Sequence, residues 1–139
     1  MVSIRSVQAS DLTAISALDA RLTGAAKPDY WHEMLAPGRH FLVAELANGA
    51  LAGFIAGEIR AWEFGQPPAG WVFAIQIDPR LRLKGVGSAL FEALVARFRA
   101  EGVTRVRTLV DRKDHLILSF FRAQGMVAGP SLQLDKDLS

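Results

Sequence analysis

The chain has 139 residues, of which 50% are hydrophobic and 22% are charged, and its formal net charge is +2. This length and composition predict one globular domain over residues 1–139 and exclude an extended disordered chain. Because cysteine is absent, the sequence also excludes disulfides, a thiolate nucleophile and cysteine-ligated zinc.

The N-terminal third begins with a predicted strand and a predicted helix. Residues 4–7 alternate as a strand does, and residues 12–22 carry leucine and isoleucine at helical spacing behind Ser10-Asp11. The chain does not start with the basic-then-apolar order of a signal peptide, and no apolar run approaches the roughly 20 residues that span a bilayer. We therefore expect a cytoplasmic protein with no membrane partner. Residues 29–35 predict one short helix before Pro37-Gly38 stops it.

Three strands follow. Residues 41–46 and 51–59 are apolar runs joined by a turn with Asn48-Gly49, a strong signal for a hairpin. Residues 62–70 contain Pro67-Pro68 and predict a loop. Residues 71–77 are rich in aromatic and β-branched side chains and predict a central strand.

The C-terminal half alternates helices and strands. Leu90, Leu94 and Phe98 form an i, i+4 stripe that predicts a helix from about Gly87 to Glu101. Residues 103–110 predict a strand, residues 116–124 a helix, and residues 126–127 and 132–134 a last pair of strands. The fold class is therefore α/β, with a mixed sheet flanked by helices.

One segment carries a chemical signal, the sequence Arg82-Leu83-Lys84-Gly85-Val86-Gly87 between the central strand and the long helix. Glycines at a strand-to-helix turn let several N–H groups approach one anion, and the helix N-terminus adds partial positive charge. Diphosphate fits such a turn, although glycine pairs also make ordinary tight turns. The segment lacks the Gly-Lys-Ser/Thr of a Walker loop, and Leu90 breaks the dinucleotide pattern GxGxxG.

The pieces around this turn resemble the GNAT N-acetyltransferase superfamily over nearly the whole chain. Residues 77–90 match its acetyl-CoA motif, and other segments resemble its parts in the same order: Ile4-Arg5 with Ser10-Asp11-Leu12, residues 41–45, residues 51–55, and Phe120-Phe121-Arg122-Ala123-Gln124-Gly125-Met126. The resemblance implies a mostly antiparallel sheet of six to seven strands with about four helices. In that sheet the parallel strands 71–77 and 103–110 splay apart.

The resemblance further implies that acetyl-CoA is the co-substrate. Its pantetheine arm would pair with the backbone near Gln76 and Ile77. Its pyrophosphate would lie on the N–H groups from Leu83 through Lys84, Gly85, Val86 and Gly87 to Ser88, with added charge from Arg82 or Lys84. Asp114 stands where the family often has Asn, and it would orient the ligand or cap the last helix.

Acetyl transfer to an amine needs a proton acceptor, because an alkylamine has a pKa near 10, and it benefits from a proton donor to the leaving thiolate. In much of the family a Tyr that supplies this proton occupies the place of Phe121. Phenylalanine has no hydroxyl, so the chain is either an enzyme that uses water or another group, or a non-catalytic acyl-CoA-binding or regulatory module. Glu58 and Glu63 are the carboxylates that could accept the proton, and we rank Glu58 acting through ordered water first, although both could equally be surface residues.

For the acceptor, Trp31 and Trp62 are candidate pocket residues. Few acids accompany them, which disfavours a polyamine as the acceptor and leaves a small aromatic or apolar amine, an amino acid or a protein N-terminus. We expect no metal, since the three histidines have no ligand spacing. Nine basic residues against three acids between Arg80 and Lys113 suit an anionic ligand, but no aromatic interleaving or motif indicates nucleic acid. A monomer or homodimer is expected.

Overall fold

The computed structural model describes residues 2–81 and 85–139. It forms two compact units, Met1–Leu109 and Val110–Ser139, and each is described by itself. The prediction of a single domain over residues 1–139 stays a prediction.

The first unit is built on one sheet with the strand order β1-β2-β3-β4-β5. Neighbouring strands are antiparallel from β1 to β4, and β5 is parallel to β4. The mixed, mostly antiparallel sheet is thus confirmed. The strands are β1 (Val2–Ser6), β2 (Arg39–Leu46), β3 (Leu51–Arg60), β4 (Ala69–Ile77) and β5 (Val106–Thr108).

The predicted number of six to seven strands is wrong, because the described residues form five. Residues 126–127 and 132–134 have strand-like composition but adopt no regular structure. A strand exists only where a neighbour completes its hydrogen-bond ladder, and Pro130 lies between these two short segments and lacks an N–H group. The strand predicted over 103–110 is likewise shorter and covers only Val106–Thr108.

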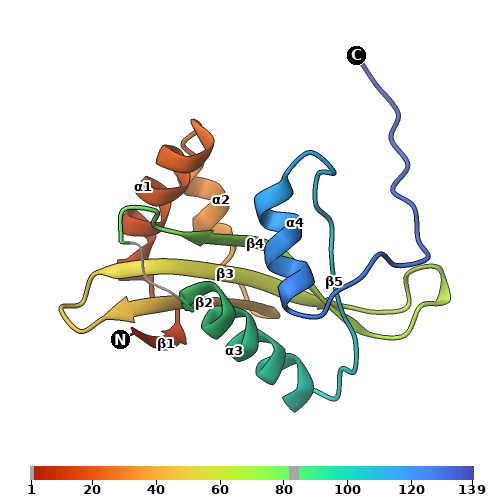
Figure 1. The fold of residues 1–139 in the computed structure, drawn as a ribbon, viewed down its shortest axis with the longest axis horizontal. Coiled ribbons are helices and arrows are strands. Elements are labelled where there is room, and N and C mark those ends of the chain that lie inside the picture. The colour runs from red at the N-terminus through yellow and green to blue at the C-terminus, as the bar shows by residue number, and fades with distance from the viewer. Residues whose placement is uncertain (1, 82–84) are drawn as a thin grey trace. The chain divides into compact units, whose positions relative to one another are not determined.

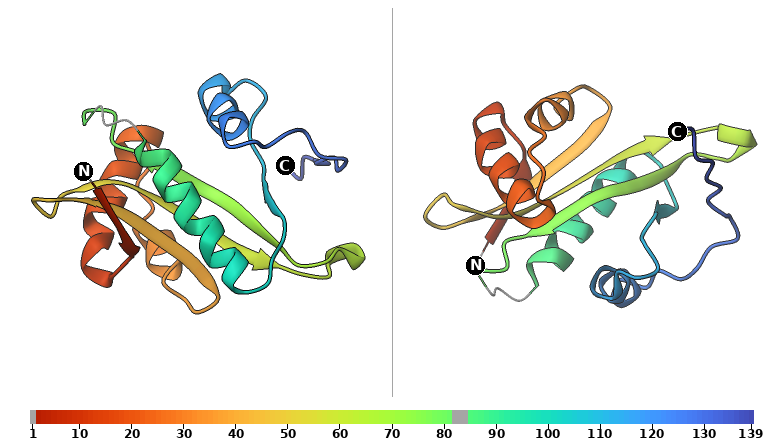
Figure 2. Two further views of the ribbon diagram at one scale, coloured as in Figure 1. Left: turned by 60° about the horizontal axis from the view of Figure 1, so that its bottom comes forward. Right: turned by 90° about the horizontal axis from the view of Figure 1, so that it is seen from above.

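Helices cover both faces of the sheet in this unit. Figures 1 and 2 show α1 (Leu12–Thr23) and α2 (Pro28–Glu33) on one face and α3 (Val86–Ala100) on the other. Two short 3-10 turns, Ala9–Asp11 and Glu63–Gly65, precede α1 and β4. With α4 (His115–Ala123) in the second unit, the four α-helices agree with the prediction.

The core beneath α1 and α2 is aromatic and aliphatic. Trp31 of α2 packs against Phe41 and Phe54, with ring centroids 5.7 Å and 5.0 Å apart. These two side chains come from β2 and β3, so one indole fixes α2 against two strands. The cluster consists of Ile15, Leu18, Trp31, Met34, Phe41, Val43, Phe54 and Ala56.

The opposite face packs against the stripe that the sequence predicted on α3. Leu90, Leu94 and Phe98 are at most 2% exposed. A Cβ at Gly57 of β3 would meet both Leu94 and Phe98, so glycine at this position lets the helix lie close to the sheet. The buried side chains of this stripe therefore form a second core layer, between α3 and the sheet.

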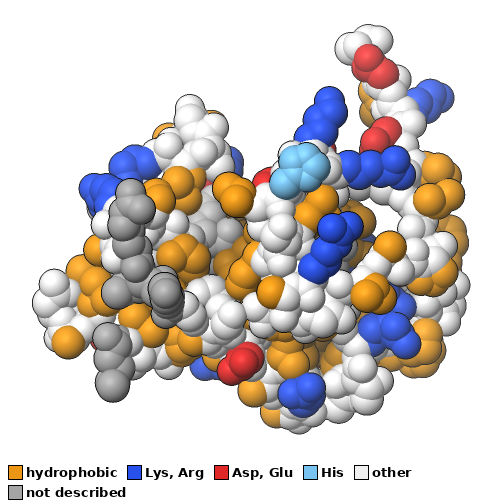
Figure 3. All heavy atoms as spheres, viewed as in Figure 1, with side chains coloured by type: hydrophobic (Ala, Val, Ile, Leu, Met, Phe, Trp, Pro, Cys, Tyr) orange, Lys and Arg blue, Asp and Glu red, His pale blue; other side chains and the backbone are white. Residues whose placement is uncertain are grey.

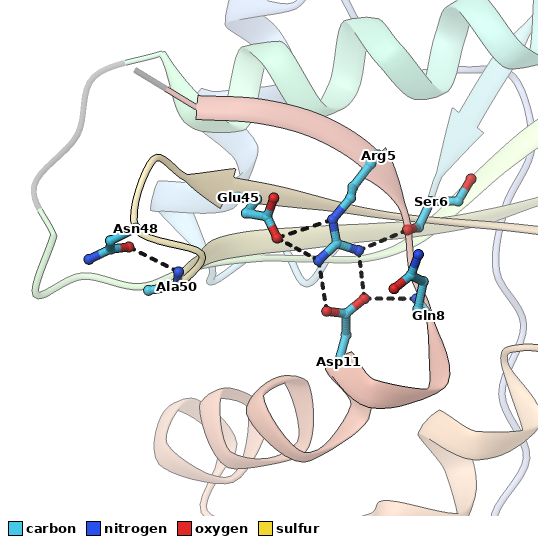
Figure 4. A network of polar contacts seen from close by, with 7 residues as sticks. All are labelled: Arg5, Ser6, Gln8, Asp11, Glu45, Asn48 and Ala50. Atoms are coloured by element: carbon cyan, nitrogen blue, oxygen red, sulfur yellow. Dashed lines mark hydrogen bonds and ion pairs between the residues drawn. The ribbon is translucent and has the colours of Figure 1, made fainter.

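A polar network closes the N-terminal edge of the sheet (Figure 4). The Arg5 guanidinium donates to both carboxylate oxygens of Asp11, at 2.7 and 2.9 Å, and to Glu45 Oε2 at 2.8 Å. The hydrogen bonds from Arg5 lower the pKa of Asp11 below its ordinary value. Arg5 thus links β1, β2 and the start of α1.

In the second unit, α4 is the one regular element among the residues described there. Asp114 caps it, since its Oδ1 accepts a hydrogen bond from the N–H of Ile117 at 3.1 Å. Among the residues described, no helix is both long and apolar enough to cross a membrane. The same residues contain no group of three or more His, Cys, Asp and Glu side chains placed to hold a metal ion.

Candidate functional site

The central parallel strands separate soon after they begin. β4 and β5 pair over three positions only, Gly70 with Val106, Trp71 with Arg107 and Val72 with Thr108. β4 then continues to Ile77, still paired with β3 but with no strand on its other side in the described part of the chain. The splay that the sequence resemblance implied is therefore present, and it leaves residues 73–77 as an open edge.

The pairing with β3 shows which backbone groups face this open edge. In an antiparallel pair, directly opposed residues alternate between hydrogen-bonded and non-hydrogen-bonded positions. Asp78 donates its N–H to the carbonyl of Ala52 at 2.8 Å, and Gln76 lies two residues earlier, opposite Phe54. The Gln76 backbone therefore faces β3, while the backbones of Ile75 and Ile77 face the open edge. Of the two residues near which the resemblance implied pairing, Ile77 therefore has its backbone on the open edge and Gln76 does not, and contact with a ligand stays a prediction.

A β-bulge marks the point where the two strands part. Ala56 of β3 pairs with Ala74 and Gly57 pairs with Val72, so Phe73 is an extra residue in β4. A bulge bends its strand and increases the local twist. It lies directly after Val72, the last residue of β4 that pairs with β5, which is where the two strands part.

Buried Asp78 holds the chain in place where β4 ends. Its Oδ1 accepts from the backbone N–H of Arg80 at 3.0 Å, and its Oδ2 accepts from the Arg80 guanidinium at 2.9 Å and from Arg21 of α1 at 3.4 Å. The Arg80 hydrogen bonds lower the pKa of Asp78 to about 2 against the desolvation that raises it. An ionised carboxylate thus ties the end of β4 to the next turn and to α1.

The predicted anion-binding turn ends at the start of α3. Gly85 has a left-handed φ of 81°, and α3 begins at Val86. The N-terminal turn of a helix carries partial positive charge, so Val86, Gly87 and Ser88 occupy the part of a helix that suits an anion. The first turn carries no acidic side chain. Arg82, Leu83 and Lys84, which the sequence assigned to the same function, lie outside the described residues.

A second buried carboxylate lies beside the open edge. Asp19 of α1 is 1% exposed and accepts hydrogen bonds from Gln76 Nε2 at 2.8 Å and from Trp31 Nε1 at 3.0 Å. Lys27 Nζ lies 3.0 Å from its Oδ2. Desolvation raises the pKa of Asp19, but the hydrogen bonds from Gln76, Trp31 and Lys27 outweigh it, so the pKa is below its ordinary value.

The candidate proton acceptor lies on the face of the sheet that α1 and α2 cover. Side chains alternate along β3, and Phe54 and Ala56 belong to the core beneath those helices, so Glu58 points to the same face. Glu58 is opposite Trp71 of β4, and its carboxylate lies 3.6 Å from Arg39. It is partly exposed, as a group that works through water must be.

The loop that follows β3 carries the predicted acceptor residue Trp62. Trp62 is 68% exposed and has a left-handed φ of 63°, and Phe64 beside it is fully exposed with a φ of 50°. Non-glycine residues with such angles are uncommon, and strained positions cluster at functional sites. The Arg60 guanidinium stacks over the Trp71 ring at 4.5 Å and donates to both oxygens of Glu63 at 2.7 and 3.0 Å.

Trp31, the other predicted acceptor residue, needs a correction. It is 2% exposed, is surrounded by core side chains and donates its indole N–H to Asp19. A side chain without solvent-accessible surface cannot line an open pocket. Its polar and proline neighbours in the sequence suggested exposure, but helix α2 turns this one position inward.

Asp114 and Phe121 belong to the second unit. Asp114 performs the capping role that the sequence allowed, and Phe121 lies in α4 with its ring 5.2 Å from that of Phe120. Their contact with a ligand stays a prediction.

Sequence reasoning missed three features of this region: the buried Asp19, the bulge at Phe73 and the stacking of Arg60 on Trp71. Asp19 follows Leu18 within the helical stripe of α1, and a charged residue on that side of the helix was the available signal. A bulge leaves no comparable pattern in a single sequence.

A family model described as the acetyltransferase (GNAT) family matches residues 7–126. No curated protein sequence matches the chain.

Solved structures share the whole fold. One is AAC(6')-Iy in complex with the bisubstrate analogue CoA-S-monomethyl-acetylneamine, with a TM-score of 0.85 at 18% identity, covering 100% of this chain and 99% of that one. A second is the aminoglycoside 6'-N-acetyltransferase AAC(6')-Ih from Acinetobacter baumannii, with a TM-score of 0.84 at 16% identity and complete coverage of both chains. A third is a transcriptional regulator from Bacillus halodurans C-125, with a TM-score of 0.82 at 16% identity, covering 98% of this chain and 100% of that one.

Proposed function

Because this chain belongs to the acetyltransferase (GNAT) family, we propose that it transfers the acetyl group of acetyl-CoA to a primary amine by direct attack in a ternary complex. The observation that carries the proposal is the open edge of β4, which lies next in the chain to the N-terminus of α3. The edge and the helix terminus have the two chemistries that this substrate requires. The edge of β4 can pair with amide groups, and the N-terminus of α3 attracts a phosphate.

Two parts of the donor match groups of the chain, the pantetheine arm and the diphosphate. The pantetheine arm contains amides, and the outward-facing backbones of Ile75 and Ile77 supply hydrogen-bond partners as an additional strand would. The diphosphate suits the N-terminal turn of α3, from Gly85 through Val86 and Gly87 to Ser88. Arg82, Leu83 and Lys84 complete this part of the proposal. When bound, acetyl-CoA supplies an activated thioester.

The residues of β3 and the following loop are proposed for the acceptor. Glu58 accepts a proton from the acceptor amine through water, and Arg39 at 3.6 Å keeps the carboxylate in place. Trp62 offers an exposed aromatic surface on the same hairpin. Two of the structural neighbours, AAC(6')-Iy and AAC(6')-Ih, are by their names aminoglycoside N-acetyltransferases, which favours a small-molecule amine over a protein N-terminus.

Phe121 supports a second candidate, a non-catalytic acyl-CoA-binding or regulatory module. Its ring cannot protonate a leaving thiolate, as the tyrosine usual at this place in the family does. Loss of one general acid lowers a rate by roughly 10²–10⁴-fold and leaves positioning intact, so we place the enzyme first. Contact of Asp114 and Phe121 with the donor is part of either proposal.

An assay of CoA release from acetyl-CoA over a broad panel of amines separates the two candidates. Release that depends on one of the amines establishes the enzyme, and tight CoA binding without release for every amine establishes the binding module.

We propose no nucleic-acid partner. The basic residues between Arg80 and Lys113 have other functions in part, since Arg80 binds Asp78 and Arg97 donates to Ser6 Oγ at 2.8 Å. On the face drawn in Figure 3, Lys and Arg side chains are interspersed with hydrophobic and uncharged ones. We also propose that the protein is located in the cytoplasm and is a monomer or a homodimer.

A further inference from the structure

Asp19 is the point where three elements of the first unit meet. Asp19 lies in α1. Its carboxylate accepts hydrogen bonds from Trp31 of α2 and Gln76 of β4, and it forms an ion pair with Lys27 just before α2. Full burial of a carboxylate is costly even when it is paired, and apolar residues of similar size often give equal stability. Stability alone therefore does not explain a carboxylate in this position.

The orientation of the Gln76 side chain depends on this carboxylate. Only the amide nitrogen can face an anion, so the NH₂ group points to Asp19 and the carboxamide oxygen points away. That oxygen is buried and has no hydrogen-bond partner in residues 2–81 and 85–139. Asp19 is thus the single polar anchor of the Gln76 side chain among the residues described.

Gln76 also has a special position in the strand. Its neighbours Ile75 and Ile77 turn their backbone groups to the open edge, while its own backbone pairs with β3. An anchor at Gln76 therefore fixes both flanking peptide groups. No strand stabilises this part of β4 from the β5 side within the described chain.

We propose that Asp19 is a positioning residue for acetyl-CoA, which acts through Gln76 to hold the open edge of β4 in the geometry that the pantetheine arm needs. This inference rests on the proposed function and adds to it a buried residue that does not touch the substrate. Preorganised partners raise affinity because the ordering cost is met before binding.

The test compares three variants by calorimetry with CoA. Asp19→Asn retains the shape of the side chain but has one acceptor oxygen for three donors, and Gln76→Leu removes the link from the other side. Trp31→Phe is the matched control, since it removes another hydrogen bond to the same carboxylate and some core volume but leaves the Asp19–Gln76 bond intact.

We expect Asp19→Asn and Gln76→Leu each to weaken CoA binding about tenfold, which corresponds to about 1.4 kcal/mol. The double variant should lose no more than either single one, because both break the same link. Trp31→Phe should bind CoA within about twofold of the wild type, although its unfolding temperature falls at least as far. In steady-state kinetics the loss should appear in KM for acetyl-CoA and leave KM for the amine unchanged.

Hydrogen exchange without ligand gives a second readout. The peptide that covers residues 71–77 should exchange faster in Asp19→Asn and Gln76→Leu than in Trp31→Phe. Equal CoA affinity and equal exchange in all three variants would overturn the inference and leave the proposed function standing. A wild-type protein that does not bind CoA would overturn both. If Asp19→Asn does not fold, Gln76→Leu decides the outcome.

Discussion

The ring of Phe98 in α3 occupies the space that a side chain at Gly70 of β4 would need. The three atoms nearest to a Cβ at Gly70 would all be ring carbons of Phe98. Gly70 is also the first residue of β4 that pairs with β5, opposite Val106. A close contact between helix and sheet therefore lies at the start of the strand pair whose separation opens the candidate site.

Gly70→Ala should destabilise the fold, since a methyl group there must displace a buried ring in a packed core. Overpacking of this kind costs about 1–3 kcal/mol, and urea denaturation followed by circular dichroism measures it. The control is Gly129→Ala, where a Cβ meets nothing within 4 Å and the backbone has no left-handed φ. Equal unfolding free energies for the two variants would contradict the packing that we describe.

Asp78 predicts a pH dependence of stability. Its pKa is about 2 in the folded protein, below the ordinary 3.8, so the folded state favours the ionised form. The resulting stabilisation is complete above pH about 4 and disappears as the pH falls toward 2. The stability difference between the wild type and Asp78→Asn should be constant at neutral pH and shrink across that window. A difference that does not change between pH 6 and 2 would show that Asp78 is not held by Arg80 as described.

Glu58→Gln tests the proposed proton acceptor. The variant should lower kcat by about 10²-fold near neutral pH, the usual contribution of one acid–base group. The deficit should shrink toward pH 10, where an alkylamine loses its proton unaided. Glu63→Gln is the control, because it removes the same charge in the next loop, where Glu63 binds Arg60. A pH profile of kcat that is the same for both variants would remove Glu58 from the mechanism.

Local patterns predicted most of the fold. The helical stripe through Leu90, Leu94 and Phe98 and the Asn48-Gly49 turn between two apolar runs correspond to α3 and the β2–β3 hairpin. Periodicity reports the direction of side chains along one element, and this information is contained in the local sequence. The predicted strands at residues 126–127 and 132–134 are absent because a strand also needs a partner, which periodicity does not reveal.

The site was predicted less completely than the fold. The resemblance located the glycine turn and the end of β4, because backbone geometry there depends on residues that are adjacent in the chain. It implied pairing near Gln76 and Ile77 and did not show which of the two faces the open edge, since the alternation of backbone direction follows from the bulge at Phe73 and the register with β3. Reasoning from its polar and proline neighbours placed Trp31 in a pocket, because the contacts that bury this side chain come from Asp19, Phe41 and Phe54, which are distant in sequence.

The most direct test of the account is calorimetric titration of CoA into the wild type, Gly85→Glu and Gly38→Glu. Both glycines have left-handed φ values, 81° and 90°, and open space around a Cβ, so the two substitutions introduce the same strain and charge. Only Gly85 precedes α3, where the new carboxylate would repel a diphosphate. We predict binding to the wild type and to Gly38→Glu and a loss of at least about 100-fold, or about 2.7 kcal/mol, in Gly85→Glu. No binding by the wild type, or equal binding by both variants, would contradict a CoA site at this turn.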